Sequence, residues 1–296
     1  MRYASDELST AGTGTLADAT AGHLLASLAL GFSRDANTTR LTRKEHRGPL
    51  RVQKALYPEG PDCCHGVIIH PPGGVVGGDE LRISMDVGDA AHALISTPGA
   101  AKWYRANGHI SRQRLDITVG RRAMLEWLPQ ETILFNEADV VFDSHITLQK
   151  DARYLGCEIL CFGRTASGER FAQGRVRQSV KIFSERTPIF IEQGELLGNG
   201  GLMGSVLGMA GHTVCANLLC AGAPLANPLL ESVRKACAPL VGETAKFGAT
   251  QLKTLVLARY LGDSSEVARQ VMLAAWRVLR PALLGREPTE LRIWNT

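Results

Sequence analysis

Short apolar segments separated by turn-forming residues recur along most of this chain, from about residue 21 to about residue 222. The segments 114–119, 144–149 and 175–183 each alternate apolar with polar residues. Alternation with a period of two is typical of half-buried strands. Its repetition at spacings of about 8 to 15 residues indicates a mainly β fold, a large antiparallel assembly of many short strands. Because strands do not alternate regularly with helical segments, the pattern disfavours a nucleotide-binding α/β sheet.

The spacing of the apolar residues changes toward the C-terminal end, near Asn227. Residues 263–266 have the D-x-x-E form of a capping box, and the apolar residues after them recur with the helical period until Pro281. We expect this helix to stop at that proline. Two weaker patterns predict helices over residues 228–238 and 249–261. The sequence therefore predicts a few helices that cap the β body.

We expect a single domain over residues 1–296, a length that is enough for a sizeable core. Residues 1–20 are rich in Ala, Thr, Ser and Gly and predict a frayed terminus. A β body is expected over about residues 21–222, followed by a helical C-terminal part over about residues 223–285.

Composition excludes several classes of protein. Hydrophobic residues make up 45% of the chain, charged residues 21%, and the net charge is only +4, as in soluble globular proteins. The sequence has no apolar stretch of roughly 18 residues to span a membrane, and no dense basic cluster with aromatic residues to bind nucleic acid. The apolar residues 24–32 lack the basic flank of a signal peptide. We therefore expect a cytoplasmic protein whose seven cysteines are reduced.

The sequence HPPGGVVGGD at residues 70–79 resembles a phosphate-binding loop in its glycine spacing. Asp79 and Glu80, however, stand where such a loop needs a lysine and a serine or threonine. Since two carboxylates repel phosphate, we expect no nucleotide on this chain. The prolines and glycines instead predict a rigid loop between strands. Asp79 at its exit either stabilises the turn or lines a cation path.

Cys63, Cys64, His65 and His70 form the densest group of thiol and imidazole side chains in the sequence. Such ligands suit nickel, zinc or copper. Adjacent cysteines rarely reach one metal together, so the alternative interpretation is that this pair flanks a strand. The sequence contains neither an H-E-x-x-H motif nor a G-x-S-x-G motif, so enzymatic hydrolysis has little support.

The sequence LEWLPQETILF at residues 125–135 places Glu126 and Glu131 within apolar stretches. An isolated charge is costly to bury. Each of these carboxylates is therefore expected to be exposed, paired or functional.

Three of these segments, HPPGGVVGGD, TPGAAKWYR from Thr97 and EWLPQETI from Glu126, resemble the urease accessory protein UreD family, also called UreH, in the same order and with similar spacing. Two further segments extend the match: TRLTRKEHRGPLRVQKALYPEG from Thr39 and GRTASGERFAQG from Gly163. The resemblance is strong over about residues 39–183. It implies a largely β, β-helix-like fold without a catalytic role.

The resemblance also implies a function, namely urease maturation by a scaffold or chaperone that assists nickel insertion. Proteins of this family bind apo-urease and a helical partner, UreF, through which the GTPase UreG delivers nickel. The GTPase supplies the P-loop, which fits the acidic exit of the glycine loop here. No permanently bound cofactor is implied, because nickel is in transit.

Oxygen ligands release nickel more readily than thiolate or imidazole sets, so a nickel path is expected to use carboxylates and hydroxyls. The candidates are polar residues inside the matching motifs: Asp79, Thr97, Glu126, Glu131, Glu158 and Glu169.

Two alternatives remain open at the level of the sequence. One is a metal-dependent hydrolase on a β scaffold that uses Cys63, Cys64, His65 or His70. The other is a passive structural adaptor whose helical part binds a partner and which never contacts metal.

Overall fold

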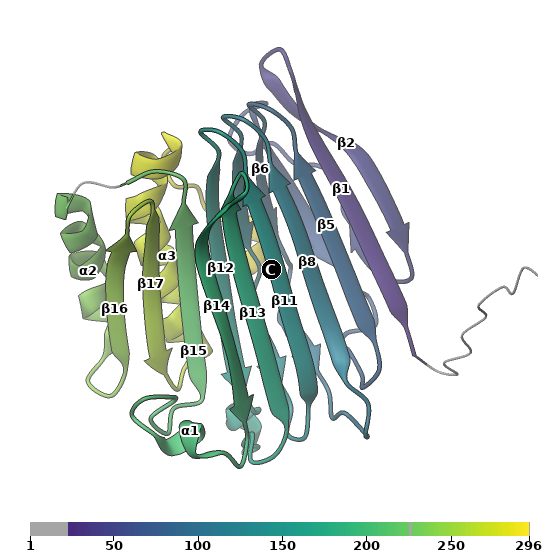
Figure 1. The fold of residues 1–296 in the computed structure, drawn as a ribbon, viewed down its shortest axis with the longest axis vertical. Helices are drawn as coiled ribbons and strands as arrows, with labels where there is room; N and C mark the ends of the chain where they lie inside the picture. Colours follow the sequence, from purple (N-terminus) through teal and green to yellow (C-terminus); the bar gives the residue numbers. More distant parts are fainter. Residues whose placement is uncertain (1–22, 225–226, 296) are drawn as a thin grey trace, which may run out of the picture.

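A computed structural model describes residues 23–224 and 227–295 of the chain. The frayed terminus expected for residues 1–20 lies outside these residues. Two facing β-sheets form the body, and helices lie at one side (Figure 1). The mainly β, β-helix-like fold is thereby confirmed, whereas the single-domain division stays a prediction.

The first sheet contains seven strands. In spatial order they are β14 (Thr187–Leu197), β13 (Arg175–Ser184), β11 (Asp139–Leu148), β8 (Ser111–Val119), β5 (Glu80–Val87), β1 (Leu25–Asp35) and β2 (Thr38–Arg47).

The second sheet contains ten strands, two of which pair beside the main path. The main path is β16 (Lys246–Leu252), β17 (Leu255–Gly262), β15 (Val214–Ala221), β12 (Arg153–Phe162), β9 (Met124–Leu128), β6 (His92–Ser96), β4 (Cys63–Ile69) and β3 (Arg51–Val52). Beside this path, β10 (Thr132–Leu134) pairs with β12, and β7 (Ala101–Trp103) pairs with β10.

Between β4 and β13 the chain passes back and forth between the two sheets, so that each coil adds a strand to both. The neighbouring strands of this solenoid are parallel, for example β5 with β8 and β9 with β12. Antiparallel pairing, which the sequence led us to expect throughout, is confined to the flanks, such as β13 with β14 and β15 with β17. Alternation reveals which face of a strand is buried but not the direction of its neighbour, which explains the error.

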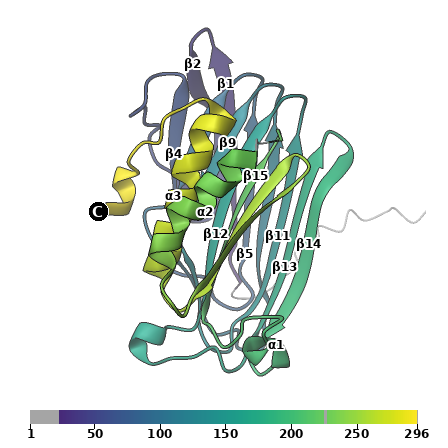
Figure 2. The same cartoon turned by 90° about the vertical axis from the view of Figure 1, so that its left-hand side faces the viewer.

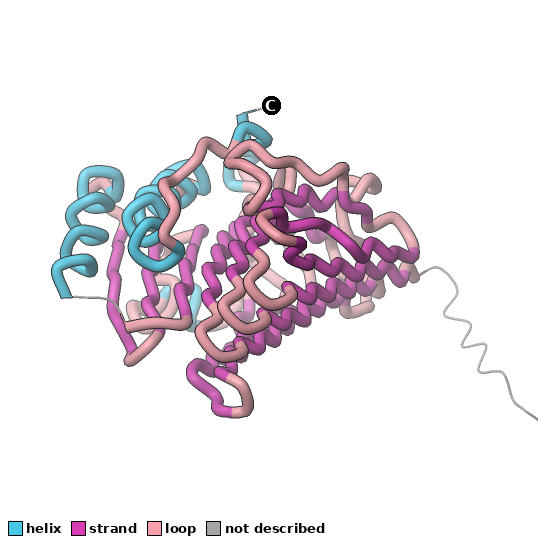
Figure 3. The backbone as a smooth tube through the Cα atoms, turned by 90° about the horizontal axis from the view of Figure 1, so that it is seen from above, coloured by secondary structure: helices cyan, strands magenta, loops and turns pink. Residues whose placement is uncertain are grey.

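In the described part of the chain, three α-helices accompany the sheets: α1 (Gly201–Gly204), α2 (Asn227–Val241) and α3 (Ser265–Leu284), with short 3₁₀ turns at Thr165–Ser167 and Arg292–Asn295. Helices α2 and α3 pack on the outer face of the second sheet (Figure 2), and the view from above shows them outside the strands (Figure 3). No helix within residues 23–224 and 227–295 is long and apolar enough to cross a membrane.

The predicted C-terminal helices are partly confirmed. Helix α2 covers the segment 228–238, and α3 follows the capping box, although Ser264 is the N-cap residue, its hydroxyl accepting a hydrogen bond from Val267 N. The expected stop at Pro281 is wrong. The helix continues to Leu284 and ends at Gly285, whose positive φ of 66° and N–H bond to Pro281 O terminate it.

The helix expected over residues 249–261 is also wrong, because this segment forms the hairpin β16–β17. Residues 255–258 are all buried, since β17 lies inside the sheet and is covered on both faces. A short run of buried residues has no alternation to distinguish a strand from a helix.

The second sheet is buried on both faces, and side-chain alternation assigns its residues to two cores. On β9, Leu125 and Trp127 join the core between the sheets, whereas Leu128 joins the core under the helices. Strand β12 follows the same rule, with Leu160 on the inner side and Ile159 on the helix side. Each polar residue on these strands likewise faces either the first sheet (the inner face) or the helices α2 and α3 (the helix face).

Candidate functional site

An interior cavity of about 230 Å³ lies between the two sheets. Its walls bring together the glycine loop, the segment after Thr97 and the segment after Trp127, which are far apart along the sequence. Its polar wall residues come from strands of both sheets and from the loops between strands: His70, Thr97, Lys102, Gln113, Gln130, Thr132 and Glu158. The motifs that the sequence singled out therefore converge on one space.

Close backbone approaches explain the glycines of the loop. A Cβ on Gly77 would lie 1.8 Å from Ala106 O, and a Cβ on Gly74 would lie 2.2 Å from the Tyr104 ring. The loop packs against these residues only because both side chains are absent.

Asp79 is buried at the end of this loop and both of its carboxylate oxygens are occupied. Oδ1 accepts a hydrogen bond of 2.9 Å from Leu24 N, and Oδ2 accepts one of 3.1 Å from Val76 N. The residue stabilises the turn and ties it to the start of β1.

Glu158 on β12 borders the interior cavity and has little compensation for its charge. Gln178 on β13 donates a hydrogen bond to it, and Glu192 on β14 adds a second negative charge nearby. Burial is the largest influence, and together these surroundings raise the pKa of Glu158 to about 7.

Two more polar groups of the cavity wall come from loops. The buried Nε2 atom of His70 has no hydrogen-bond partner among the described residues, and burial lowers the pKa of this imidazole. Thr97 Oγ1 accepts a hydrogen bond of 2.9 Å from Gln130 N.

Two further spaces lead on from the interior cavity. A cavity of about 40 Å³ shares Trp127 and Glu158 with it and also touches Glu192 and Asn217. A groove of about 460 Å³ is lined by the latter two residues and by Arg259. Glu158 therefore lies at the junction of the first two spaces.

The other face of the second sheet holds a buried ionic network centred on Arg280 of α3, here called the Arg280 network. The Arg280 side chain is fully buried and donates to two carboxylates. Nε and Nη2 each lie 3.0 Å from an oxygen of Glu126, and Nη1 and Nη2 lie 2.7 and 2.8 Å from the oxygens of Glu59. A bidentate arrangement of this kind is the strongest that a guanidinium makes.

Three further side chains complete the network. Trp276 Nε1, one helical turn before Arg280, donates to Glu126 at 2.7 Å. His92 Nε2 lies 2.9 Å from Glu126, and His65 Nε2 lies 2.7 Å from Glu59. The network joins α3 to strands β4, β6 and β9.

The carboxylates of the network have lowered pKa values, whereas the pKa of Glu158 is raised. Burial alone would raise the pKa of Glu126, but the hydrogen bonds and charges of His92 and Arg280 hold it below its usual value. His65 and Arg280 likewise outweigh burial and hold the pKa of Glu59 well below the usual range. Both carboxylates are therefore ionised and paired.

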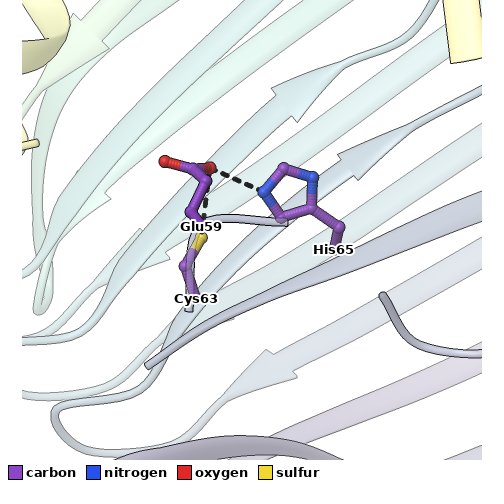
Figure 4. A group of neighbouring side chains, drawn as sticks. All are labelled: Glu59, Cys63 and His65. Atoms are coloured by element: carbon purple, nitrogen blue, oxygen red, sulfur yellow. Dashed lines mark hydrogen bonds and ion pairs between the residues drawn. The ribbon is translucent and has the colours of Figure 1, made fainter. Parts of the chain in front are cut away.

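Donor atoms for a metal occur within this network. Glu59, Cys63 and His65 each place a ligand atom within 4.8 Å of the others (Figure 4), as do Cys63, His92 and Glu126. Cys64 faces the core between the sheets, as expected for adjacent residues of a strand. Of the four thiol and imidazole residues grouped by the sequence, only Cys63 and His65 lie together.

The remaining candidates from the sequence are dispersed. Glu131 is half-buried, and its charge contributes to the raised pKa of Cys161, in which burial is the largest influence. Glu169 lies in a loop, where it accepts hydrogen bonds from Asn136 N at 2.6 Å and from Arg164 Nε at 2.8 Å.

The sequence did not single out four residues of the network: Glu59, His92, Trp276 and Arg280. Arg280 could have been identified from the sequence, because it stands on the apolar face of the predicted helix, one turn after Trp276. A charged residue at such a position needs a buried partner.

All seven cysteines are free, and burial raises the pKa of the Cys157 and Cys215 thiols to about 12, so neither is an activated nucleophile.

Comparison with known proteins adds a family assignment to this geometry. The sequence profile described as UreD urease accessory protein matches residues 25–295. A urease accessory protein UreD from Janthinobacterium sp. (strain Marseille) is 54% identical over 271 residues, which cover 92% of this chain and 91% of the relative. Proteins of the same name from Nitrosospira multiformis and Dechloromonas aromatica are 48% and 47% identical, cover 92% of this chain, and are themselves covered to 98% and 94%.

Proposed function

Because the chain belongs to the UreD urease accessory protein family and is a non-catalytic urease maturation factor, we propose that it is a scaffold that binds apo-urease and the other accessory proteins. Its partners are a UreF-like helical protein and, through the complex, a UreG-like GTPase, and it acts in the cytoplasm. Family membership rules out the hydrolase considered from the sequence.

The protein also assists nickel insertion into urease. Nickel is its cargo and passes through the interior cavity. The observation that carries this step is the uncompensated polar wall, where Glu158 has no cationic partner among its recorded interactions and His70 Nε2 has no hydrogen-bond partner among the described residues. A carboxylate and an imidazole both bind nickel. Thr97 adds a hydroxyl oxygen to the same wall.

The other candidates from the sequence fit this route less well. Both oxygens of Asp79 are bonded to backbone N–H groups, and Glu169 is paired with Arg164. Glu126 is held by Arg280 on the opposite face of the sheet. Glu131 stays a candidate at the edge of the route. The proposed path therefore centres on Glu158, His70 and Thr97.

The scaffold role is tested by co-purification of the chain with apo-urease and with the helical accessory protein. The expected result is a complex that contains both partners. Capture of neither partner by a soluble, folded chain contradicts the role.

The nickel route needs a separate measurement, namely the nickel content of urease matured by variant complexes. Glu158→Gln removes the charge but keeps the shape, and Glu169→Gln is the matched control. We expect normal assembly with both variants and a several-fold lower nickel content with Glu158→Gln alone. Unchanged nickel content in a normally assembled complex favours the passive adaptor instead.

A further inference from the structure

A second group of metal-binding atoms lies outside the interior cavity, at the start of β4. Glu59 Oε1 is 2.7 Å from His65 Nε2 and 3.8 Å from Cys63 Sγ (Figure 4). All three side chains come from one stretch of seven residues with the pattern E-x-x-x-C-x-H. The donors are one carboxylate oxygen, one sulfur and one imidazole nitrogen.

The backbone holds this stretch in place without any metal. Leu56 and His65 exchange two N–H···O bonds of 3.0 and 2.9 Å, and Gly60, with a φ of 101°, makes the turn between them. Cys63 and His65 are two residues apart on a strand and so share a face. Little reorganisation is needed to bring the three donors onto one ion.

We propose that Glu59, Cys63 and His65 form a binding site for one borderline divalent cation, for which zinc is the best match. Mixed oxygen, sulfur and nitrogen ligands suit zinc, and three protein ligands leave a fourth tetrahedral position for water. On binding, the Cys63 S–H bond breaks, its proton passes to solvent and the thiolate ligates the ion. The hydrogen that His65 Nε2 donates to Glu59 is lost to solvent while Nδ1 carries a hydrogen, so that the neutral imidazole ligates through Nε2.

Arg280 does not exclude this site, because its contacts with Glu59 are divided between two oxygens. A cation on Oε1 displaces Nη2 from that oxygen, while Nη1 stays 2.7 Å from Oε2. The contacts of Arg280 with Glu126 remain. The guanidinium lowers the affinity of the site by repulsion, so binding is expected to be reversible.

Space for the fourth ligand lies beside the imidazole. A cavity of about 300 Å³ is lined by His65, Leu94 and Leu291, and the C-terminal segment forms one of its walls. This cavity lies on the helix side of the second sheet, away from Glu158, so the site is separate from the proposed nickel route.

The experiment is a zinc titration of the metal-free full chain in competition with a chromophoric chelator. Cys63→Ala is the main variant, and Cys64→Ala is its matched control, because the neighbouring thiol faces the opposite side of β4. We expect one zinc per chain, an affinity at least about 10-fold lower in Cys63→Ala, and unchanged affinity in Cys64→Ala.

Cobalt substitution identifies the ligands. A thiolate-to-cobalt charge-transfer band is expected in the wild type and in Glu158→Gln, but not in Cys63→Ala. If Cys63→Ala does not fold, His65→Ala and the isosteric Glu59→Gln carry the same expectation of weaker binding. Equal zinc affinity in wild type and folded ligand variants, or no zinc bound by the wild type, overturns the proposal and leaves a purely ionic network.

Discussion

Glu126 and Glu158 lie on neighbouring strands of the same sheet, β9 and β12, but face opposite sides. Glu126 faces α3 and is bonded to His92, Trp276 and Arg280. Glu158 faces the interior cavity, where Gln178 donates to it and Glu192 repels it. The pKa of Glu126 is consequently lowered and that of Glu158 is raised to about 7. Burial raises the pKa of both carboxylates, and only Glu126 has cationic partners that outweigh it.

The two faces of the sheet therefore have different functions. On the helix face the charge is neutralised within the protein, so Glu126 fixes α3 to the sheet. On the inner face the charge is left without a cation, which costs stability but leaves an oxygen ligand free for a passing ion. Four substitutions test this difference between the two faces.

Arg280→Met is expected to have the largest effect, because it leaves two buried carboxylates without their cation. Breaking a buried ion pair in this way costs about 3–5 kcal/mol, measured as the free energy of unfolding in urea at pH 7. The control is Arg121→Met, which removes an exposed pair with Asp89 and is expected to have a much smaller effect, because solvent screens exposed charges. Equal effects of the two variants contradict the central place of the network.

Glu126→Gln is expected to cost about 2–4 kcal/mol at pH 7, since the amide keeps the shape but not the charge that Arg280 needs. The lowered pKa of Glu126 gives stability that is present above the unfolded value of 4.5 and is lost as the pH falls through the folded pKa. The difference between wild type and variant should therefore shrink in acid. A constant difference between pH 7 and pH 3 is the contrary outcome.

Glu158→Gln is expected to raise the free energy of unfolding, whereas the two preceding substitutions lower it. Because its folded pKa is raised from 4.5 to about 7, the wild type loses stability as the pH rises through this window, and the variant does not. Urea unfolding should show the variant to be more stable by about 1–3 kcal/mol at pH 8 and nearly equal to wild type at pH 4.5. If the variant is less stable than wild type at pH 8, the claim that the charge of Glu158 lacks a cationic partner is refuted.

Glu169→Gln is expected to have the smallest effect, a loss of less than about 1 kcal/mol at pH 7. Its carboxylate pairs with Arg164 in a loop, where solvent screens the charge. The same unfolding measurement serves as the baseline for the other three variants. A loss comparable to that of Glu126→Gln would remove the distinction between a loop carboxylate and a buried one.

Much of the fold was accessible from the sequence, because alternation reports directly on burial. The sequence predicted the strands at 114–119, 144–149 and 175–183, the helix after the capping box at 263–266, and a loop between strands at 70–79. Strand direction and the hairpin at 246–262 were not, since neither leaves a mark on apolar periodicity.

The site was less accessible, because its contacts span the chain. Arg280 lies 154 residues from Glu126 and 221 residues from Glu59. Glu126 and Glu158 look alike in the sequence, each a glutamate within an apolar stretch. Their difference arises from α3 on one side and from β13 and β14 on the other, which only the folded chain brings together.

The most direct test is an NMR titration of the glutamate carboxyl carbons in the folded chain. The two signals are assigned by their disappearance in Glu126→Gln and Glu158→Gln. We expect the Glu158 signal to titrate near pH 7 and the Glu126 signal still to report an ionised carboxylate at pH 4.5. Titration of both carboxyls at the same pH, or of Glu126 above Glu158, would contradict this expectation.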